Sequence, residues 1–214
     1  MMTLDSLVNS ANQLLDTGVK YIDLTLGILL GLLAIYLVNI FVFKRKLNYL
    51  GVIPRRLLGL PGIIFSPFLH QDFSHLLFNL FPLFILTNLL LIRGLETYLA
   101  VTVILIFMTG ILTWLFGRMA IHIGASSLIL GYWGFLLMSL SGGITVSAVL
   151  TVFVCLYYFG NFIFSIIPQA GEEGGQVSWE GHLFGLLSGF ILGYEWFIDH
   201  GKFIIALANY LGLA

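Results

Sequence analysis

Residues 119–171 read MAIHIGASSLILGYWGFLLMSLSGGITVSAVLTVFVCLYYFGNFIFSIIPQAG and contain no Lys, Arg, Asp or Glu. A helix that crosses a bilayer needs about 20 apolar residues, so these 53 residues can hold two spans and a turn. A soluble domain usually carries about 25% charged residues. The stretch therefore predicts helices that lie inside a membrane.

The composition of the whole chain extends this prediction to all 214 residues. Hydrophobic residues make up 59%, charged residues 9%, and the mean hydropathy is +1.05. A net charge of −1 offers no basic surface for nucleic acid. Cys155 is the single cysteine, which excludes an intramolecular disulfide. Residues 1–23 carry three aspartates ahead of the apolar run, unlike a cleavable signal. We expect an all-α polytopic membrane protein with one domain, 1–214.

Runs without charged residues predict six spans. Basic residues follow the first and second runs, and glycines or prolines separate the others. A long connection over residues 47–72 joins the first two spans, and residues 169–180 form a glycine-containing loop before the sixth. The expected spans cover residues 24–43, 73–92, 96–116, 124–140, 144–167 and 181–198.

Polar residues lie at corresponding ends of three spans. Six sequential spans alternate in direction, so the second, fourth and sixth begin on the same membrane face. His75 and Asn79 lie in the first turns of the second span. Ser126 lies in the first turn of the fourth span, and His182 in that of the sixth. At about 1.5 Å of depth per residue, all four lie close below one surface. Polar groups at membrane depth are costly, which favours a function.

The spacing within these spans also fits a site. His75 and Asn79 are four residues apart and share one helix face, although each alone is more typical of hydrogen bonding between helices. The sixth span repeats a small residue at every fourth position, a pattern that lets helix backbones approach closely. Close approach also brings a serine on one helix within reach of a histidine on another. The repeated residues are Gly181, Gly185, Gly189 and Gly193.

These residue types fit acyl transfer. Histidine is the base suited to activate a serine hydroxyl near neutral pH. Acyl transfer also needs donors for the developing oxyanion, and the backbone N–H of Ser126 and the polar pair of the second span are candidates. Asp72 and Glu180 flank the region but are assigned to loops, so no carboxylate completes a triad. The residues predict a dyad of Ser126 and His182.

Three motifs, spread over nearly the whole chain, resemble those of the rhomboid intramembrane serine proteases. That family has a six-helix core with HxxxxHxxxN in the second helix, GxSG opening the fourth and HxxGxxxG in the sixth. The matching segments here are His70-Gln-Asp-Phe-Ser-His75-Leu-Leu-Phe-Asn79, Gly124-Ala125-Ser126 and His182-Leu-Phe-Gly185-Leu-Leu-Ser-Gly189.

The resemblance implies a role for each matched residue. Ser126 would be the nucleophile and His182 the general base. The oxyanion hole would consist of the His75 and Asn79 side chains with the backbone amides of Ser126 and Ala125. The residues expected to shape the site are His70, Gly124, Gly185 and Gly189.

The expected function is therefore that of a serine endopeptidase that cuts other membrane proteins in or near their transmembrane segments. Its substrates would be helices with small or helix-destabilising residues near the membrane face of Ser126. Residues 169–180 and the fifth helix would form a cover through which the substrate enters. The resemblance implies no cofactor and no metal, and a multi-pass location in a bacterial cell membrane.

Three positions depart from the family pattern. Ser127 replaces the glycine that follows the nucleophile, and Leu130 replaces a frequent aromatic residue. Arg55 and Arg56 stand in the first loop, where a Trp-Arg pair is expected. Because the first two changes lie close to Ser126, the alternative is an inactive rhomboid-like protein that binds membrane clients without cutting them.

A metal-dependent membrane protease or a metal carrier is a third possibility. The zincin pattern HExxH is absent, and a spacing of five residues does not stack two ligands on one helix face. The histidines that prompt this alternative are His70, His75, His122 and His182.

The family implies an N-terminus on the inner side of the membrane. This orientation places three basic residues inside and six outside, which conflicts with the positive-inside rule. We expect the long first loop to lie in the interface, where its basic residues meet lipid headgroups.

Overall fold

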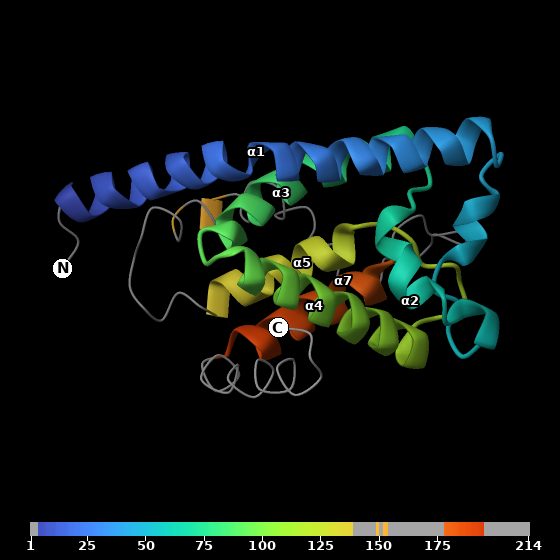
Figure 1. Ribbon diagram of the computed structural model, residues 1–214. Helices are drawn as coiled ribbons and strands as arrows, with labels where there is room; N and C mark the ends of the chain where they lie inside the picture. Colours follow the sequence, from blue (N-terminus) through green and yellow to red (C-terminus); the bar gives the residue numbers. More distant parts are fainter. Residues whose placement is uncertain (1–3, 139–148, 150–151, 154–177, 195–214) are drawn as a thin grey trace, which may run out of the picture.

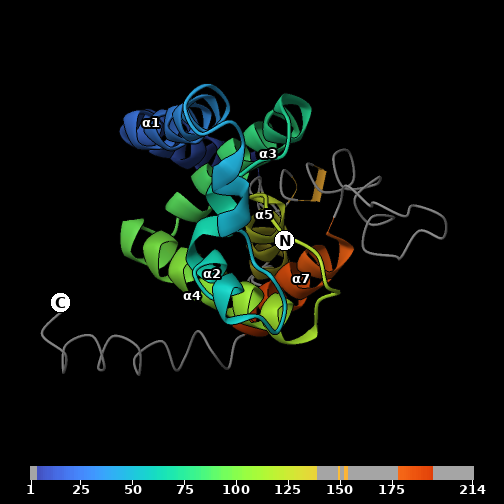
Figure 2. The ribbon, with the colours of Figure 1, turned by 90° about the vertical axis from the view of Figure 1, so that its right-hand side faces the viewer.

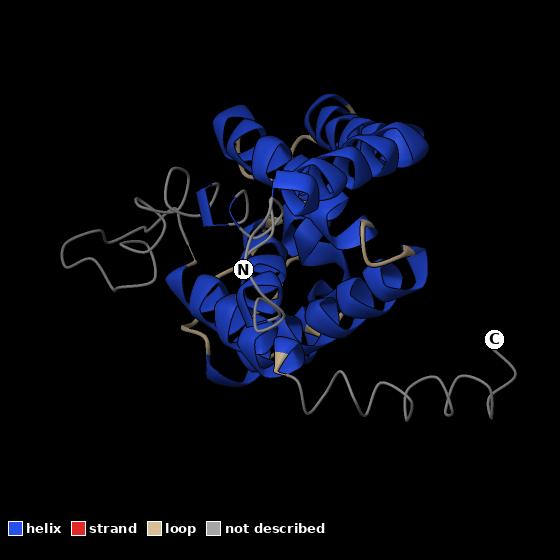
Figure 3. Ribbon diagram, turned by 90° about the vertical axis from the view of Figure 1, so that its left-hand side faces the viewer, coloured by secondary structure: helices blue, strands red, loops and turns tan. Residues whose placement is uncertain are grey.

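A computed structural model describes residues 4–138, 149, 152–153 and 178–194. Helices dominate these residues, as Figure 3 shows, and confirm the all-helical class for this part of the chain. The only β-type pairing within it is an isolated antiparallel bridge between Val52 and His122. Nearly all of the expected fifth span, residues 144–167, lies outside the described residues. The count of six spans therefore stays a prediction.

Among the described residues, three helices are long and apolar enough to cross a membrane. They are α1 (Leu4–Phe41), α3 (Phe73–Leu91) and α4 (Leu95–Phe116). The ends of α3 and α4 agree closely with the expected spans. α1 begins far upstream of residue 24, and its 38 residues measure about 57 Å, against about 30 Å for the hydrocarbon of a bilayer. It lies along α3 on one side of the molecule (Figure 1).

Four short helices replace the expected long connection after α1. They are η1 (Lys46–Leu50), η2 (Leu57–Gly59), α2 (Gly62–Phe65) and η3 (Ser66–Phe68). α2 packs against α4, next to which it lies in Figure 2.

The first loop is attached to the end of α4 by hydrogen bonds. Arg55 Nη1 donates to the carbonyl oxygens of Leu115, at 3.1 Å, and Gly117, at 2.8 Å. Trp114 Nε1 donates to the carbonyl oxygen of Arg56 at 2.9 Å. A positive charge is favourable at a helix C-terminus. Arg55 therefore holds the loop in place, in the region where the family pattern has a Trp-Arg pair.

The centre of the molecule is α5, described over Ser126–Met138. It contacts α3, α4 and α7 (Trp179–Gly193), and lies among them in Figure 1. Almost every side chain of α5 is buried, which explains why its sequence is apolar on all faces. The fully buried side chains of the core include Leu76, Leu86, Leu90, Leu105, Ile129, Leu130 and Tyr132.

Glycines of α7 touch the backbone of α5 directly. A Cβ added at Gly185 would lie 2.1 Å from the carbonyl oxygen of Ser127, and one at Gly189 would lie 2.1 Å from that of Gly131. No larger residue fits such positions without displacing a helix. The predicted close approach of the sixth span is confirmed, and its partner is the helix that carries Ser126. α7 starts two residues before the expected residue 181, and Tyr194, which follows its last residue, is extended rather than helical.

Candidate active site

Ser126 is the first residue of α5 because the chain turns sharply just before it. Gly124 has a φ of +122°, a conformation that residues with side chains rarely adopt. A Cβ at this position would also lie 2.7 Å from the Nε2 and Cε1 atoms of His75. The helix therefore begins two residues after the expected residue 124, and only a glycine lets the chain pass so close to the His75 ring.

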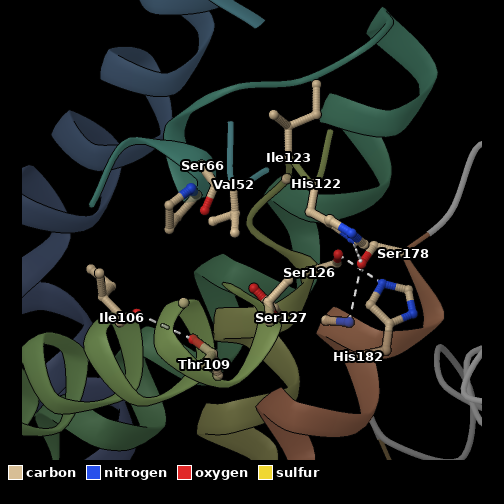
Figure 4. A pocket seen from close by; sticks show the side chains of 15 residues that line it. Val52, Ser66, Ile106, Thr109, His122, Ile123, Ser126, Ser127, Ser178 and His182 are labelled. Atoms are coloured by element: carbon tan, nitrogen blue, oxygen red, sulfur yellow. Dashed lines mark hydrogen bonds between the residues drawn. The ribbon is translucent and has the colours of Figure 1, made fainter. Parts of the chain in front are cut away.

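The hydroxyl of Ser126 and the ring of His182 are in direct contact. His182 lies in the first turn of α7, and its Nε2 atom is 2.8 Å from Ser126 Oγ (Figure 4). Exposed fractions of 2% for His182 and 6% for Ser126 show that both are buried. If the hydroxyl donates to Nε2, the neutral imidazole carries its proton on Nδ1. The structure brings together the two residues that helix direction was expected to place on one membrane face.

The HxxxxHxxxN motif begins in the loop before α3 and ends in the second turn of this helix. Asp72 caps this helix, since its Oδ1 atom accepts from the backbone N–H of His75 at 2.8 Å. The ring of His75 lies against Gly124, beside the loop that leads to Ser126. Asn79 Nδ2 donates to the carbonyl oxygen of His75 at 2.8 Å, and one further N–H of this amide can serve another acceptor. The structure thus brings His75 next to the serine loop, while one N–H of Asn79 is bonded within its own helix.

His70 lies in the loop before α3 and is almost fully buried. Burial is the main cause that lowers its pKa to about 3; the nearby His75 also lowers the pKa, while the backbone of Phe68 and the charge of Asp72 oppose the shift. The neutral ring accepts a hydrogen bond at Nε2 from the backbone N–H of Ala125, at 3.5 Å. This contact supports a site-shaping role for His70. It also engages the Ala125 amide, which was expected to face the oxyanion.

Polar residues that the sequence analysis did not group together lie beside the dyad. Glu180, expected in a loop, is in the first turn of α7, and its carboxylate accepts from the backbone N–H of Arg118 at 3.2 Å. Ser178 caps α7 and contacts His122 Nδ1, as Figure 4 shows. The assignment of Glu180 to a loop was wrong because the start of α7 was placed at Gly181. A serine cap followed by an acidic first turn is the signal that would have identified the earlier start.

The two residues that depart from the family motif have different surroundings. Ser127 is half-buried and lines the same pocket as Ser126 and His182. Its Cβ lies near Gly181, where an added Cβ would make an ordinary van der Waals contact of 3.7 Å with it. Leu130 has no exposed surface and belongs to the hydrophobic core. Within the described ranges, no group of three His, Cys, Asp or Glu residues is arranged to hold a metal ion.

Fold and site together define a helical protein with helices of membrane-spanning length and a buried serine–histidine pair at the adjoining ends of two helices. The domain model described as "Rhomboid domain" matches residues 58–198. The chain belongs to the rhomboid family.

Its similar curated relatives are mycobacterial and uncharacterized. Proteins of Mycobacterium bovis and Mycobacterium tuberculosis are each 35% identical to this chain over 158 residues, which is 70% of this chain and 64% of the relative. A protein of Mycobacterium leprae is 37% identical over 141 residues, covering 62% of this chain and 55% of the relative. The chain therefore spans less than two thirds of the length of these relatives.

Proposed function

We propose that the protein is an intramembrane serine endopeptidase that cleaves peptide bonds in or near transmembrane segments. The observation that supports this most strongly is the 2.8 Å contact between His182 Nε2 and Ser126 Oγ. Serine becomes a useful nucleophile only when a base lies within hydrogen-bond reach. Membership of the rhomboid family, whose members are generally serine proteases of this kind, supports the same conclusion.

In the acylation step, Ser126 Oγ attacks the carbonyl carbon of the scissile peptide bond while His182 Nε2 takes the hydroxyl proton. The C–N bond of the resulting tetrahedral intermediate then breaks, and His182 returns the proton to the leaving amine. An acyl ester on Ser126 remains. Because both side chains are buried, the charges that develop in this step lie in a medium of low dielectric constant, where nearby dipoles act strongly.

The oxyanion would form on the side of His75. The ring of His75 and the Ser126 hydroxyl both border the space left open by the missing side chain of Gly124. The backbone N–H of Ser126, at the start of α5, needs no acceptor within the helix and can donate to this oxyanion. We assign the supporting donors to His75 and Asn79.

In the second half of the reaction, a water molecule attacks the acyl ester. His182 removes its proton, and the ester bond to Ser126 Oγ breaks, which restores the hydroxyl and releases the new carboxylate. The chain's own residues are sufficient for every proton transfer in this scheme. The substrates are proteins of the membrane in which this chain lies, and we place that membrane in a bacterial cell.

A serine-directed phosphonate and a reporter protein with one transmembrane segment test the proposal. The wild type is expected to react with the phosphonate and to cut the reporter, whereas Ser126→Ala should do neither. His182→Ala should lose at least about a hundredfold in either rate, because the hydroxyl loses its base. Ser127→Ala is the matched control, since it removes the neighbouring hydroxyl. Cleavage that persists in Ser126→Ala would refute the assignment of the nucleophile.

The second candidate function is binding of membrane clients without cleavage. It is favoured by Ser127 and Leu130, the two departures from the motif around the nucleophile. Under this alternative, the wild type would bind a transmembrane client but would be inert toward the phosphonate. The labelling experiment therefore separates the two functions.

A further inference from the structure

The nucleophile and the base belong to segments 56 residues apart, so something must fix their relative position. Glycine contacts set the distance between α5 and α7. They do not by themselves fix the first turn of α7, which carries His182. Four polar residues occupy the junction between that turn and the loop that leads to Ser126. We call them the junction cluster: Arg118, His122, Ser178 and Glu180.

His122 connects three segments of the chain. Its backbone exchanges two hydrogen bonds with Val52 of the first loop, at 3.0 and 2.9 Å. Its Nε2 atom is 3.0 Å from the carbonyl oxygen of Arg118, which can only accept, so Nε2 carries the proton. The Nδ1 atom of the neutral ring is then an acceptor, and the hydroxyl of Ser178 donates to it. Burial lowers the pKa of His122, in agreement with this neutral form.

Ser178 uses both hydrogen-bonding capacities of its hydroxyl. While its O–H donates to His122, its oxygen accepts the backbone N–H of Gly181 at 3.0 Å, as the cap of α7. Gly181 directly precedes His182. The side chain of His122 is thus joined through one hydroxyl to the backbone next to the base.

Glu180 makes the second connection. Its side chain is 3% exposed, and its Oε1 atom lies 3.2 Å from the backbone nitrogen and 3.4 Å from Nε of Arg118. A carboxylate this deeply buried is costly unless it is paired and hydrogen-bonded. The position of Oε1 therefore depends on Arg118 and opposes movement of the first turn of α7.

We propose that the junction cluster positions the base: Glu180 and Ser178 hold the first turn of α7 against the loop of Arg118 and His122, and so keep His182 Nε2 within hydrogen-bond distance of Ser126 Oγ. This inference rests on the proposed protease function for its kinetic consequence. The hydrogen bonds of the junction cluster join the segments around the dyad, and not the reacting hydroxyl itself. The four residues act through His182, as positioning residues.

Alanine and conservative variants of the full-length protein test this role. A displacement of about 1 Å at a catalytic group can reduce a rate about a hundredfold. We expect Glu180→Ala and Ser178→Ala to react about 10 to 100 times more slowly with the phosphonate and to cut the reporter with a lower kcat but an unchanged KM. Glu180→Gln keeps an oxygen acceptor and Ser178→Thr keeps the hydroxyl, so both should stay within about threefold of wild type.

Two controls separate positioning from loss of folding. Glu96→Ala removes an exposed carboxylate from the first turn of another helix and should leave the rates unchanged. Ser178→Gly removes the hydroxyl but retains a residue that helix caps tolerate, so it should fold and still react about tenfold more slowly. Melting temperatures identify the folded variants, and rates are compared per folded molecule.

Hydrogen exchange at the backbone amides of residues 178–182 gives a readout that does not depend on activity. Exchange should be faster in Glu180→Ala and Ser178→Gly than in wild type. Unchanged exchange would overturn the inference. Labelling at the wild-type rate by folded Glu180→Ala and Ser178→Gly would also overturn it, and so would an equal loss of labelling rate in Glu180→Gln and Glu180→Ala. A wild type that does not react with the phosphonate would refute the protease function instead, and the exchange experiment would still decide the role of the cluster.

Discussion

Gly185→Ala should separate α5 from α7 and disable the dyad. The added Cβ would lie 2.1 Å from the carbonyl oxygen of Ser127, about 1.3 Å short of the 3.4 Å at which ordinary contact begins. The oxygen belongs to the backbone of α5 and the Cβ is held rigidly by the backbone of α7, so neither can rotate away. Overpacking of this kind costs about 1–3 kcal/mol of stability.

The same separation acts on the reacting atoms, because Ser127 follows the nucleophile and Gly185 lies one turn from the base. Movement of about 1 Å takes the 2.8 Å contact between Ser126 and His182 beyond the usual hydrogen-bond length of about 3.2 Å. We therefore expect phosphonate labelling to slow by about a hundredfold.

Labelling rate per folded molecule and melting temperature in detergent are the measurements. Gly31→Ala is the matched control, because a Cβ at this helical position of α1 meets nothing within 4 Å. It should leave labelling unchanged and should not lower the melting temperature. A Gly185→Ala protein that reacts and melts like wild type would refute the backbone contact between α5 and α7.

Two further predictions concern the loops. Because the pKa of His70 is lowered to about 3 in the folded protein, its ring stays neutral there, whereas in the unfolded chain it binds a proton below about pH 6.5. The free energy of unfolding should therefore fall as the pH drops from 6.5 toward 3. His70 contributes at most about 1.4 kcal/mol per pH unit to this fall. The melting temperature of His70→Gln should depend less on pH over this range than that of wild type. Parallel curves of melting temperature against pH for the two proteins would contradict the lowered pKa of His70. Arg55→Gln removes the charged donor to the end of α4 and should lower the melting temperature by a few degrees, corresponding to about 1 kcal/mol. Arg56→Gln, whose backbone contact with Trp114 is retained, is the control, and an equal loss in both variants would argue against a specific role for Arg55.

The helices that the sequence predicted well have their ends encoded locally. α3 begins after the cap Asp72, and the Arg93-Gly94 pair ends the apolar run that forms it. The start of α1 was not predictable from hydropathy. The charged residues before residue 24 exclude that segment from the hydrocarbon of the membrane, but they do not prevent it from forming a helix. The start of α5 depends on the contact between Gly124 and His75, which joins residues far apart in the sequence.

The contact between Ser126 and His182 was predictable because helix order alone puts the starts of three helices on one face. The junction cluster was not, since no periodicity relates Arg118 and His122 to Ser178 and Glu180. Each of these residues is ordinary at its own position, and only their contact across helices makes them notable. The mistaken loop assignment of Glu180 also hid a carboxylate in the first turn of α7.

The distance in sequence between Ser126 and His182 has a consequence for synthesis of the protein. Chains elongate at about 5 to 20 residues per second, so the segment that carries the base follows the nucleophile by roughly 3 to 11 seconds. Under the proposed function, the nascent chain has during this interval a nucleophile without its base, His182. It cannot cut its neighbours in the insertion machinery until α7 has been made and packed against α5. Under the proposed function, proteolytic activity therefore begins only after this helix is in place.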